Sequence, residues 1–327
     1  MKQISILIPA YNEEEVLPAM KEALEKVTGN LSNYAFEFLF INDGSTDRTQ
    51  EMLHAYHLED SRVRYIELSR NFGKEKAMLA GFDYAKGDAI IIMDADLQHP
   101  PSMIEEMLYW WEQGYEDVYT VRKEKAEKNA FRKWTSDTYY KVLSRISEQE
   151  VYKGAGDFRL LDRKCVEALK ELRESERNTK GLYAYIGFKK KALEYDEAER
   201  VAGETKWRLS ELIRLAIDGI TSYTTAPLRM WSILGMLISI LSFIYLAYEL
   251  YHAFVHGSEV AGYPSLLAAI VFLGGVQLIS LGAIGEYLAR VFIETKQRPV
   301  YFVRETTQNK IENEKEKEKV QNDDDIL

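Results

Sequence analysis

A short apolar run that ends in two carboxylates restricts most strongly what this chain can fold into. Residues Ile90–Met93 are all apolar, and Asp94 and Asp96 follow directly, before a pair of prolines that begins at Pro100. A continuous apolar run of this length predicts a buried parallel strand, because such strands are covered on both faces. Open α/β sheets bind ligands at the carboxyl ends of their strands. We therefore expect the two aspartates to lie at a ligand site.

The spacing of these two carboxylates also suits a metal ion. Residues i and i+2 of a strand point to the same face, so Asp94 and Asp96 can approach one cation. Oxygen ligands favour Mg²⁺ or Mn²⁺, and such ions usually hold phosphates. The alternative interpretation is a pair of solvated loop acids, which an Asp-x-Asp tripeptide with no strand before it would favour.

Strand-like and helix-like segments alternate along the N-terminal part of the chain. We predict a helix over residues 75–85, and strands at Ile4–Ile8, Phe36–Ile41, Val63–Leu68, Ala89–Met93 and Val118–Val121. This alternation is typical of an α/β fold with a doubly wound, mostly parallel sheet. Polar loops follow the first four strands, so we expect these loops to converge on one edge of the sheet. Neither G-x-G-x-x-G nor G-x-x-x-x-G-K-[ST] occurs, which argues against a dinucleotide fold and a P-loop NTPase.

Charge and cysteine content exclude further classes. The 327 residues carry a formal net charge of -10, which argues against nucleic acid as a partner. The single cysteine, Cys165, rules out an intrachain disulfide and fits a reducing compartment. Residues 305–327 alternate acidic residues with lysines and contain few apolar residues, which predicts a disordered or loosely helical tail.

Two long uncharged stretches, Met230–Tyr248 and Val260–Gly285, predict transmembrane helices. Each is long enough to cross a hydrocarbon core of about 30 Å. The intervening segment His256–Glu259 contains no lysine or arginine, whereas Arg229 precedes the first stretch and Arg290 follows the second. By the positive-inside rule, both termini lie in the cytoplasm and the protein is a multi-pass protein of the plasma membrane. Homo-oligomers are an expected possibility, because small residues in the second stretch allow close helix packing.

These features divide the chain into segments. Apolar residues recur at helical spacing after residue 208, which predicts an amphipathic helix at the membrane interface. We expect a cytoplasmic catalytic domain at 1–207, an interface helix at 208–228, transmembrane helices at 229–255 and 263–286, a juxtamembrane amphipathic segment at 287–304 and the charged tail at 305–327.

Eight short motifs in consistent order resemble those of one enzyme family. They are Pro9–Glu13, Asn42–Asp47, Ser69–Lys74, Asp94–Gln98, Gly156–Leu160, Arg200–Trp207, Gly285–Tyr287 and Arg298–Tyr301. Together they resemble the family 2 inverting glycosyltransferases, in particular the polyprenyl-phosphate branch. That branch includes dolichol-phosphate mannose synthase and bacterial enzymes that load glucose or N-acetylglucosamine onto undecaprenyl phosphate. The resemblance covers about residues 1–304 and is more specific than any single motif.

The resemblance implies a GT-A type nucleotide-sugar fold and assigns roles around the donor. Metal ligands would be Asp94, Asp96 and Gln98, with Mg²⁺ or Mn²⁺ as cofactor. Donor contacts would come from Pro9, Tyr11, Glu13, Asp43, Arg70, Asp94 and Ala95. The alternatives are turn and cap residues at the first two loops, a surface salt bridge for Arg70, and a simple loop residue for His99.

The remaining implied roles concern the acceptor. Asp157 would face the anomeric carbon, and with Asp96 and Arg122 it would be a catalytic residue. A hydroxyl acceptor would need Asp157 as general base, whereas an ionised phosphate acceptor would leave it to orient the sugar or the acceptor. The alternative is a core carboxylate paired with Arg159. Acceptor phosphate contacts would come from Arg122, Arg132, Arg200 and Lys206, for which a charged helix and a linker are the alternatives.

The function predicted from the sequence is inverting transfer of a sugar from a nucleotide-sugar to a polyprenyl phosphate at the cytoplasmic face of the membrane. UDP-glucose and UDP-N-acetylglucosamine are favoured as donors, and GDP-mannose stays open. A processive polysaccharide synthase is a second hypothesis, but its Q-x-x-R-W motif and additional membrane spans are not found. A non-catalytic membrane scaffold is the third, and the acidic and basic residues at the strand ends argue against it.

Overall fold

The computed structural model describes residues 1–122, 155–175, 177–195 and 262–307, together with single residues between 237 and 255. These residues form two compact units, which are described separately. The first unit holds the described residues up to Tyr195 and those from Pro299 onward, and the second holds the described part of residues 208–298.

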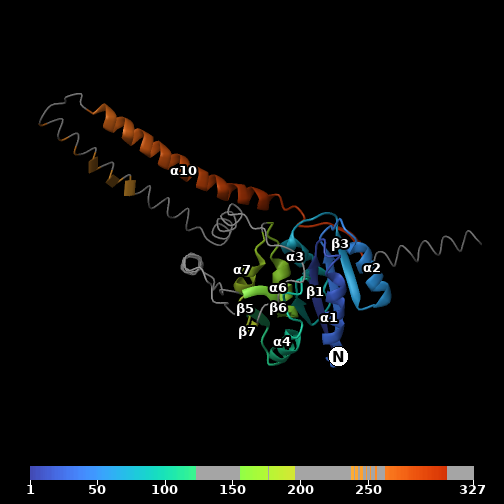
Figure 1. Cartoon of the computed structure of the whole chain (residues 1–327). Helices are drawn as coiled ribbons and strands as arrows, with labels where there is room; N and C mark the ends of the chain where they lie inside the picture. The colour runs from blue at the N-terminus through green and yellow to red at the C-terminus, as the bar shows by residue number, and fades with distance from the viewer. Residues whose placement is uncertain are drawn as a thin grey trace, which may run out of the picture. The chain divides into compact units, whose positions relative to one another are not determined.

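The first unit contains an eight-stranded sheet and its covering helices (Figure 1). Its strands are β1 (Lys2–Ala10), β2 (Tyr34–Asn42), β3 (Val63–Leu68), β4 (Ala89–Ile92), β5 (Asp117–Arg122), β6 (Ala155–Asp162), β7 (Lys190–Tyr195) and β8 (Val303–Thr306). Its helices are α1 (Leu17–Gly29), α2 (Thr49–Glu59), α3 (Lys74–Tyr84), α4 (Met103–Glu112), α6 (Arg163–Glu171) and α7 (Thr179–Tyr185). The five predicted strands and the predicted helix are confirmed, with ends that shift by one or two residues.

The sheet is mixed, with the strand order β7-β5-β6-β4-β1-β2-β3-β8. The first four strands run parallel to one another, whereas β6 is antiparallel to β4 and β5, and β8 is antiparallel to β3. The prediction of a mostly parallel α/β sheet is therefore right for the strands that carry the first four loops. The antiparallel strands β6 and β8 were not predicted.

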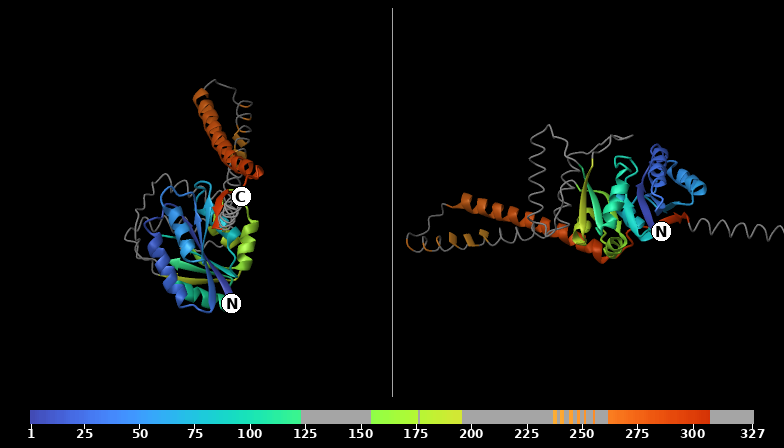
Figure 2. Two further views of the ribbon diagram at one scale, coloured as in Figure 1. Left: turned by 90° about the vertical axis from the view of Figure 1, so that its right-hand side faces the viewer. Right: turned by 90° about the horizontal axis from the view of Figure 1, so that it is seen from below.

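Helices cover both faces of the sheet (Figure 2). Strand β1 shows how the alternation of side chains divides the core: Ile4, Ile6 and Ile8 pack with α1, α2 and α4, whereas Leu7 packs with α3, α6 and α7. All four residues of β4 are fully buried, as a strand covered on both faces requires. Helix α3 lies so close to the sheet that a Cβ atom at Gly81 would meet the Leu7 side chain at 2.2 Å.

The topology determines where loops meet. Because β4 lies on the opposite side of β1 from β2 and β3, the chain order reverses between β1 and β4, which is the usual ligand crevice of an open α/β sheet. The antiparallel strand β6 begins at the same edge where β4 ends. In the β4–β6 register Ile92 pairs with Arg159, and continuing that register by two residues places Asp157 opposite Asp94.

The chain also returns to the first unit near its C-terminal end. Strand β8 pairs with the outer edge of β3, where Arg304 Nη1 contacts Glu67 Oε1 at 2.8 Å and the Tyr65 hydroxyl lies 2.7 Å from Glu305 Oε1. The predicted boundary between residues 304 and 305 is therefore wrong, because it divides this strand. The outer edge of β3 offers unpaired backbone N–H and C=O groups, and the polar segment β8 forms a strand by bonding to them.

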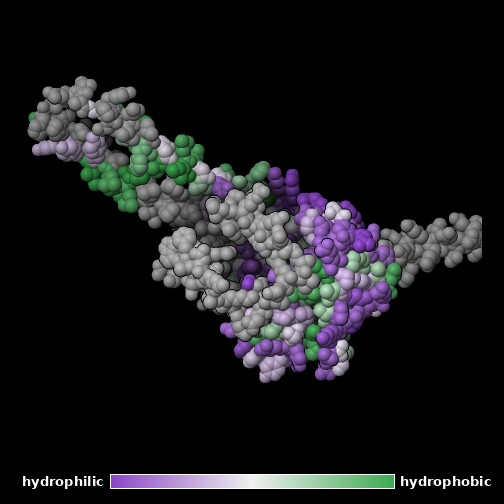
Figure 3. Space-filling view, in the orientation of Figure 1, coloured by the Kyte–Doolittle hydropathy of each residue, from purple (hydrophilic) through white to green (hydrophobic). Residues whose placement is uncertain are grey.

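The second unit contains α10 (Tyr263–Thr295), a single helix of 33 residues. It extends beyond the predicted span 263–286 and includes the first half of the predicted segment 287–304. Within it, the 24 residues Phe272–Thr295 are long and apolar enough to cross a membrane. Large apolar side chains such as Leu278 and Leu281 are exposed on it, and Figure 3 shows hydrophobic surface along this helix.

Several predicted segments lie outside the described residues. They are the interface helix 208–228, most of the first predicted transmembrane helix 229–255, and the tail beyond Thr307. These assignments stay predictions.

Candidate active site

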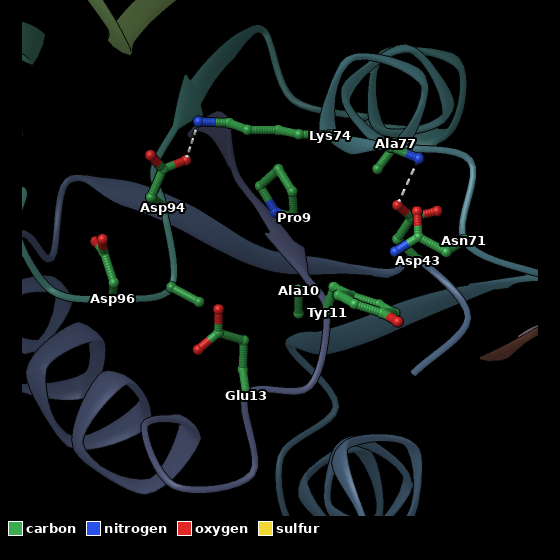
Figure 4. A pocket seen from close by; sticks show the side chains of 12 residues that line it. Pro9, Ala10, Tyr11, Glu13, Asp43, Asn71, Lys74, Ala77, Asp94 and Asp96 are labelled. Carbon is green, nitrogen blue, oxygen red and sulfur yellow. Dashed lines mark hydrogen bonds and ion pairs between the residues drawn. The ribbon is translucent and has the colours of Figure 1, made fainter. Parts of the chain in front are cut away.

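A pocket of about 320 Å³ lies at the carboxyl edge of the four parallel strands. It is lined by residues at the end of β1 or after β1, β2, β3 and β4, namely Pro9, Ala10, Tyr11, Glu13, Asp43, Asn71, Gly73, Lys74, Ala77, Asp94, Ala95 and Asp96. The predicted convergence of the four loops is thus confirmed. Figure 4 shows two sides to the pocket, with Asp43 and Asn71 on one and Asp94, Asp96 and Glu13 on the other. We call these sides the Asp43 wall and the Asp94 wall.

Hydrogen bonds from backbone N–H groups to side chains stabilise the Asp43 wall. Asp43 is 3% exposed, and its two carboxylate oxygens accept hydrogen bonds from the backbone N–H of Phe72 at 2.7 Å and of Gly73 at 2.8 Å. Burial nevertheless raises the pKa of Asp43, more than these two donors lower it. Gly44 has φ +66°, and a Cβ atom there would meet the Arg70 backbone at 2.4 Å. The β2 and β3 loops are therefore fixed against each other.

The β1 loop is braced to the β2 loop in the same way. The backbone N–H of Asn12 donates to Ser45 Oγ at 3.0 Å, and Asn12 Oδ1 accepts from the backbone N–H of Thr46 at 2.8 Å. Asn12 itself has φ 56°, a conformation that asparagine tolerates better than most residues. Tyr11 stays 44% exposed at the pocket mouth, so a large aromatic ring is accessible there.

The Asp94 wall begins at a tight turn after β4. Asp96 Oδ1 accepts a hydrogen bond from the backbone N–H of Gln98 at 3.1 Å, across Leu97 with φ 56°. Asp94 and Asp96 both line the pocket, as predicted. Gln98, the third predicted metal ligand, is not among the described residues that line it.

His99 is a buried residue that stabilises this turn. It is 8% exposed and its ring is stacked on Phe158, with 4.7 Å between ring centroids. Its Nδ1 accepts a hydrogen bond from the backbone N–H of Asp94 at 3.3 Å. Burial lowers the pKa of His99, which favours the neutral ring that can accept this bond. His99 is therefore a buried support of Asp94, a role that a proline-rich loop sequence did not indicate.

Lys74 connects the wall to Asp157. Its ammonium nitrogen lies 2.6 Å from Asp94 Oδ1 and 3.0 Å from Asp157 Oδ2. Burial lowers the pKa of Lys74, but the two carboxylates outweigh this and raise it above its ordinary value. The sequence prediction did not assign Lys74 a role. A possible signal was its position at the first residue of α3, since a lysine is electrostatically unfavourable at a helix N-terminus unless acids compensate.

Asp157 lies near the start of β6 and is 8% exposed. Burial raises its pKa, but Lys74, together with Lys180 and Arg159, lowers it below the ordinary range, so the side chain is a carboxylate. Its Oδ1 atom has no hydrogen-bond partner within the described part of the chain. The alternative reading, a core ion pair between Asp157 and Arg159, is not observed.

Arg159 has other partners. Its Nη1 lies 3.1 Å from the buried carboxylate of Asp117, and its Nη2 donates to the carbonyl of Gly156 at 2.8 Å. The guanidinium also lies over the ring of Tyr183, 3.6 Å from the centroid. This pair holds the start of β6, which carries Asp157, by a charge-assisted contact.

The Asp94 wall has excess negative charge that fits a divalent cation. The pKa of Glu13 is raised to about 7, first by burial and then by the charges of Asp96 and Asp94. No group of three histidines, cysteines, aspartates or glutamates in the described ranges forms a complete metal site. Two carboxylates are nevertheless sufficient for Mg²⁺ or Mn²⁺ when water and substrate phosphates supply the other ligands. The residues present therefore fit a cation held jointly with a phosphate ligand.

The other predicted residues lie farther from the pocket or outside the described part. Arg70 is exposed, donates to the Asn71 carbonyl at 3.0 Å and lies 4.1 Å from the centroid of the Phe72 ring. Arg122 is exposed at the end of β5, on the same edge of the sheet as Asp94. Arg132, Arg200 and Lys206 lie outside the described residues.

An acidic crevice at the carboxyl edge of a mixed α/β sheet is typical of enzymes that bind nucleotide-sugars. The chain belongs to glycosyl transferase family 2, whose family model matches residues 5–170. Residues 226–291 match a second family model, described as the GtrB C-terminal hairpin. The protein is therefore a glycosyltransferase, and the family resemblance found in the sequence motifs is confirmed.

Relatives are similar over nearly the whole chain. The putative glycosyltransferase CsbB of Bacillus subtilis is 44% identical over 307 residues, which cover 93% of both chains. The bactoprenol glucosyl transferase of Shigella phage SfV is 40% identical over 306 residues, covering 94% of this chain and 99% of that protein. A prophage bactoprenol glucosyl transferase homolog of Escherichia coli is 40% identical over 302 residues, or 92% and 98% of the two chains. These relatives fit the polyprenyl-phosphate branch of the family.

Proposed function

We propose that this protein transfers glucose from UDP-glucose to a polyprenyl phosphate, with inversion at the anomeric carbon, at the cytoplasmic face of the plasma membrane. The observation that carries the proposal is a crevice lined by Asp94, Asp96 and Lys74, whose ammonium also contacts Asp157. The same chain has a helix apolar enough to cross a membrane. Relatives named bactoprenol glucosyl transferase support the choice of sugar and of lipid acceptor. UDP-N-acetylglucosamine is the second donor to test.

The nucleoside and the diphosphate of the donor would bind to different walls. The uracil and ribose lie against the Asp43 wall, where Pro9, Tyr11 and Asp43 offer ring and hydrogen-bonding contacts, and Arg70 closes the outer side. The diphosphate lies toward the Asp94 wall, beside Ala95 and Glu13. Asp94 and Asp96, with Gln98 as the predicted third ligand, would hold Mg²⁺ or Mn²⁺ there. When bound, such an ion neutralises the charge on the departing diphosphate.

Asp157 acts on the other side of the sugar. Because its pKa is lowered, it is a weak base, and a polyprenyl phosphate is already ionised near neutral pH. A carboxylate in this place therefore orients the sugar and stabilises the positive charge that builds up at the anomeric carbon in the transition state. The Oδ1 atom of Asp157, which is buried and has no hydrogen-bond partner among the described residues, would make this contact.

The acceptor would arrive from the membrane. Arg122 at the end of β5 is placed to attract its phosphate, and the predicted contacts from Arg132, Arg200 and Lys206 would add to this attraction. We propose two transmembrane helices with both termini in the cytoplasm, of which α10 supplies the second. Homo-oligomers would form through small residues such as Gly274 and Gly275 in α10, where a Cβ atom would meet nothing within 4 Å.

A transfer assay with several donors tests the proposal. Purified protein in detergent is incubated with Mn²⁺, undecaprenyl phosphate and radiolabelled UDP-glucose, UDP-N-acetylglucosamine or GDP-mannose, and the lipid is extracted into organic solvent. We expect label in the organic phase with UDP-glucose, and none without the lipid or with the Asp157→Asn variant. Label released only into water would contradict the proposal, and label from another donor would correct the sugar.

A further inference from the structure

Lys74 is the one basic residue among the pocket-lining residues in the described part of the chain. Four carboxylates line the same pocket, from Glu13, Asp43, Asp94 and Asp96. The Lys74 ammonium contacts Asp94, at 2.6 Å, and Asp157, at 3.0 Å. Lys74 therefore lies between Asp94, a proposed cation ligand, and Asp157, the proposed catalytic carboxylate.

This position is costly for a lysine unless the carboxylates hold it. Lys74 is the first residue of α3, after Gly73 with φ 95°, and the helix N-terminus has a partial positive charge. Its ammonium is nevertheless directed into the pocket, as Figure 4 shows for Lys74 and Asp94. The register between β4 and β6 explains why both acids reach it, because Asp94 just after β4 lies opposite Asp157 near the start of β6.

We propose that Lys74 is an internal counter-ion of the Asp94 wall: it competes with the divalent cation for Asp94, and it holds the Asp157 carboxylate in place for transfer. The proposal rests on the proposed function, since it concerns the same site. An ammonium 2.6 Å from Asp94 Oδ1 competes with a divalent cation for the negative charge of the same carboxylate. It keeps Asp157, 3.0 Å away, as its second partner. Cation binding and the placement of Asp157 are thereby coupled through one side chain.

The coupling makes Lys74 different from a lysine that only stabilises the fold. Removing a structural lysine weakens every function of the site. Removing a competing charge strengthens cation binding, because two positive charges about 4 Å apart repel each other substantially even near a protein surface. Lys74→Met therefore should bind the cation more tightly and yet transfer sugar more slowly.

The first experiment measures Mn²⁺ binding to the full-length protein without donor, from the electron paramagnetic resonance signal of free Mn²⁺, and again with UDP. We expect Lys74→Met to bind Mn²⁺ about tenfold more tightly than the unchanged protein, and Lys74→Arg within about threefold of it. Lys86→Met is the matched control, since it removes the same charge from an exposed residue outside the pocket. Its Mn²⁺ affinity should not change.

A second measurement separates the roles of Lys74. In the transfer assay, the Lys74→Met variant should have a kcat at least tenfold lower, because Asp157 loses its partner, and Lys74→Arg should recover part of it. If Lys74→Met does not fold, Lys74→Gln removes the charge with a similar side-chain length. Unchanged or weaker Mn²⁺ binding in a folded variant overturns the proposal, and so does absence of Mn²⁺ binding to all variants with and without UDP. Absence of transfer by the unchanged protein would instead contradict the proposed function.

Discussion

The two walls of the pocket are held in different ways. In the Asp43 wall a buried carboxylate accepts two hydrogen bonds from backbone N–H groups, and loops are fixed to each other through further bonds between backbone N–H groups and short side chains. In the Asp94 wall the carboxylates depend on one lysine side chain and on a turn supported by His99. A short carboxylate held by two backbone donors has little freedom to move when a ligand binds, whereas a long lysine side chain can move. We therefore expect the first wall to be a preformed binding surface and the second to rearrange when ligands bind.

The largest expected effect is on the Asp94 side. Asp157→Asn removes the charge that we propose faces the sugar, so turnover should fall at least about 100-fold. The Asp43 wall is unchanged, and UDP affinity, measured by calorimetry, should stay within about threefold. Equal losses of turnover and UDP binding would show that Asp157 supports the whole pocket, and the distinction between the walls would be wrong.

The next effect tests the Asp43 wall. Gly44→Ala places a Cβ atom 2.4 Å from the Arg70 backbone at a residue with φ +66°, so the free energy of unfolding should fall by about 1–3 kcal/mol. The thermal unfolding midpoint and UDP affinity should both decrease. Gly114→Ala is the control, because Gly114 has φ +84° but a Cβ atom there meets nothing within 4 Å. If both variants bind UDP equally well, close contact of these loops is not what forms the binding surface.

A smaller effect follows from Glu13. Its pKa is raised from 4.5 to about 7, mainly by burial and then by Asp96 and Asp94, so the folded state binds a proton that the unfolded state has lost between these pH values. Stability should therefore fall as pH rises from about 4.5 to about 7, by about 1–2 kcal/mol once solvent screening of this half-buried group is considered. In Glu13→Gln, thermal unfolding midpoints measured across this range should show a weaker fall. An unchanged pH profile would contradict charge crowding at the Asp94 wall.

The smallest effect is expected at the outer edge of the sheet. Arg304→Ala removes the ion pair with Glu67 on the edge strand β8, where the arginine side chain is 59% exposed. The Arg304 end of the pair is solvated and the Glu67 side chain is 11% exposed, so stability should change by only about 1 kcal/mol. The kcat and UDP affinity should not change. A clear loss of turnover would show that β8 participates in the site and that two walls do not describe it completely.

Much of this arrangement could be predicted because the first five strands are apolar and locally recognisable. A run such as Ile90–Met93 needs burial on both faces, and polar loops after successive parallel strands must meet at one edge. The strand β8 could not be predicted, because its polar residues form a strand only where the β3 edge is available. Strand β6 was not predicted either, because its place and direction in the sheet depend on pairing with β4 and β5.

The sequence by itself determined the α/β class, the acids at the strand ends, the long apolar helix and the family. These are local properties: hydrophobic pattern, residue type and short motifs. Only the tertiary structure decided that Lys74 joins Asp94 to Asp157, that Arg159 pairs with Asp117, and that His99 supports the turn. Each of these contacts depends on strand order and register, which arise from packing between distant segments, and so no single stretch of sequence contains them.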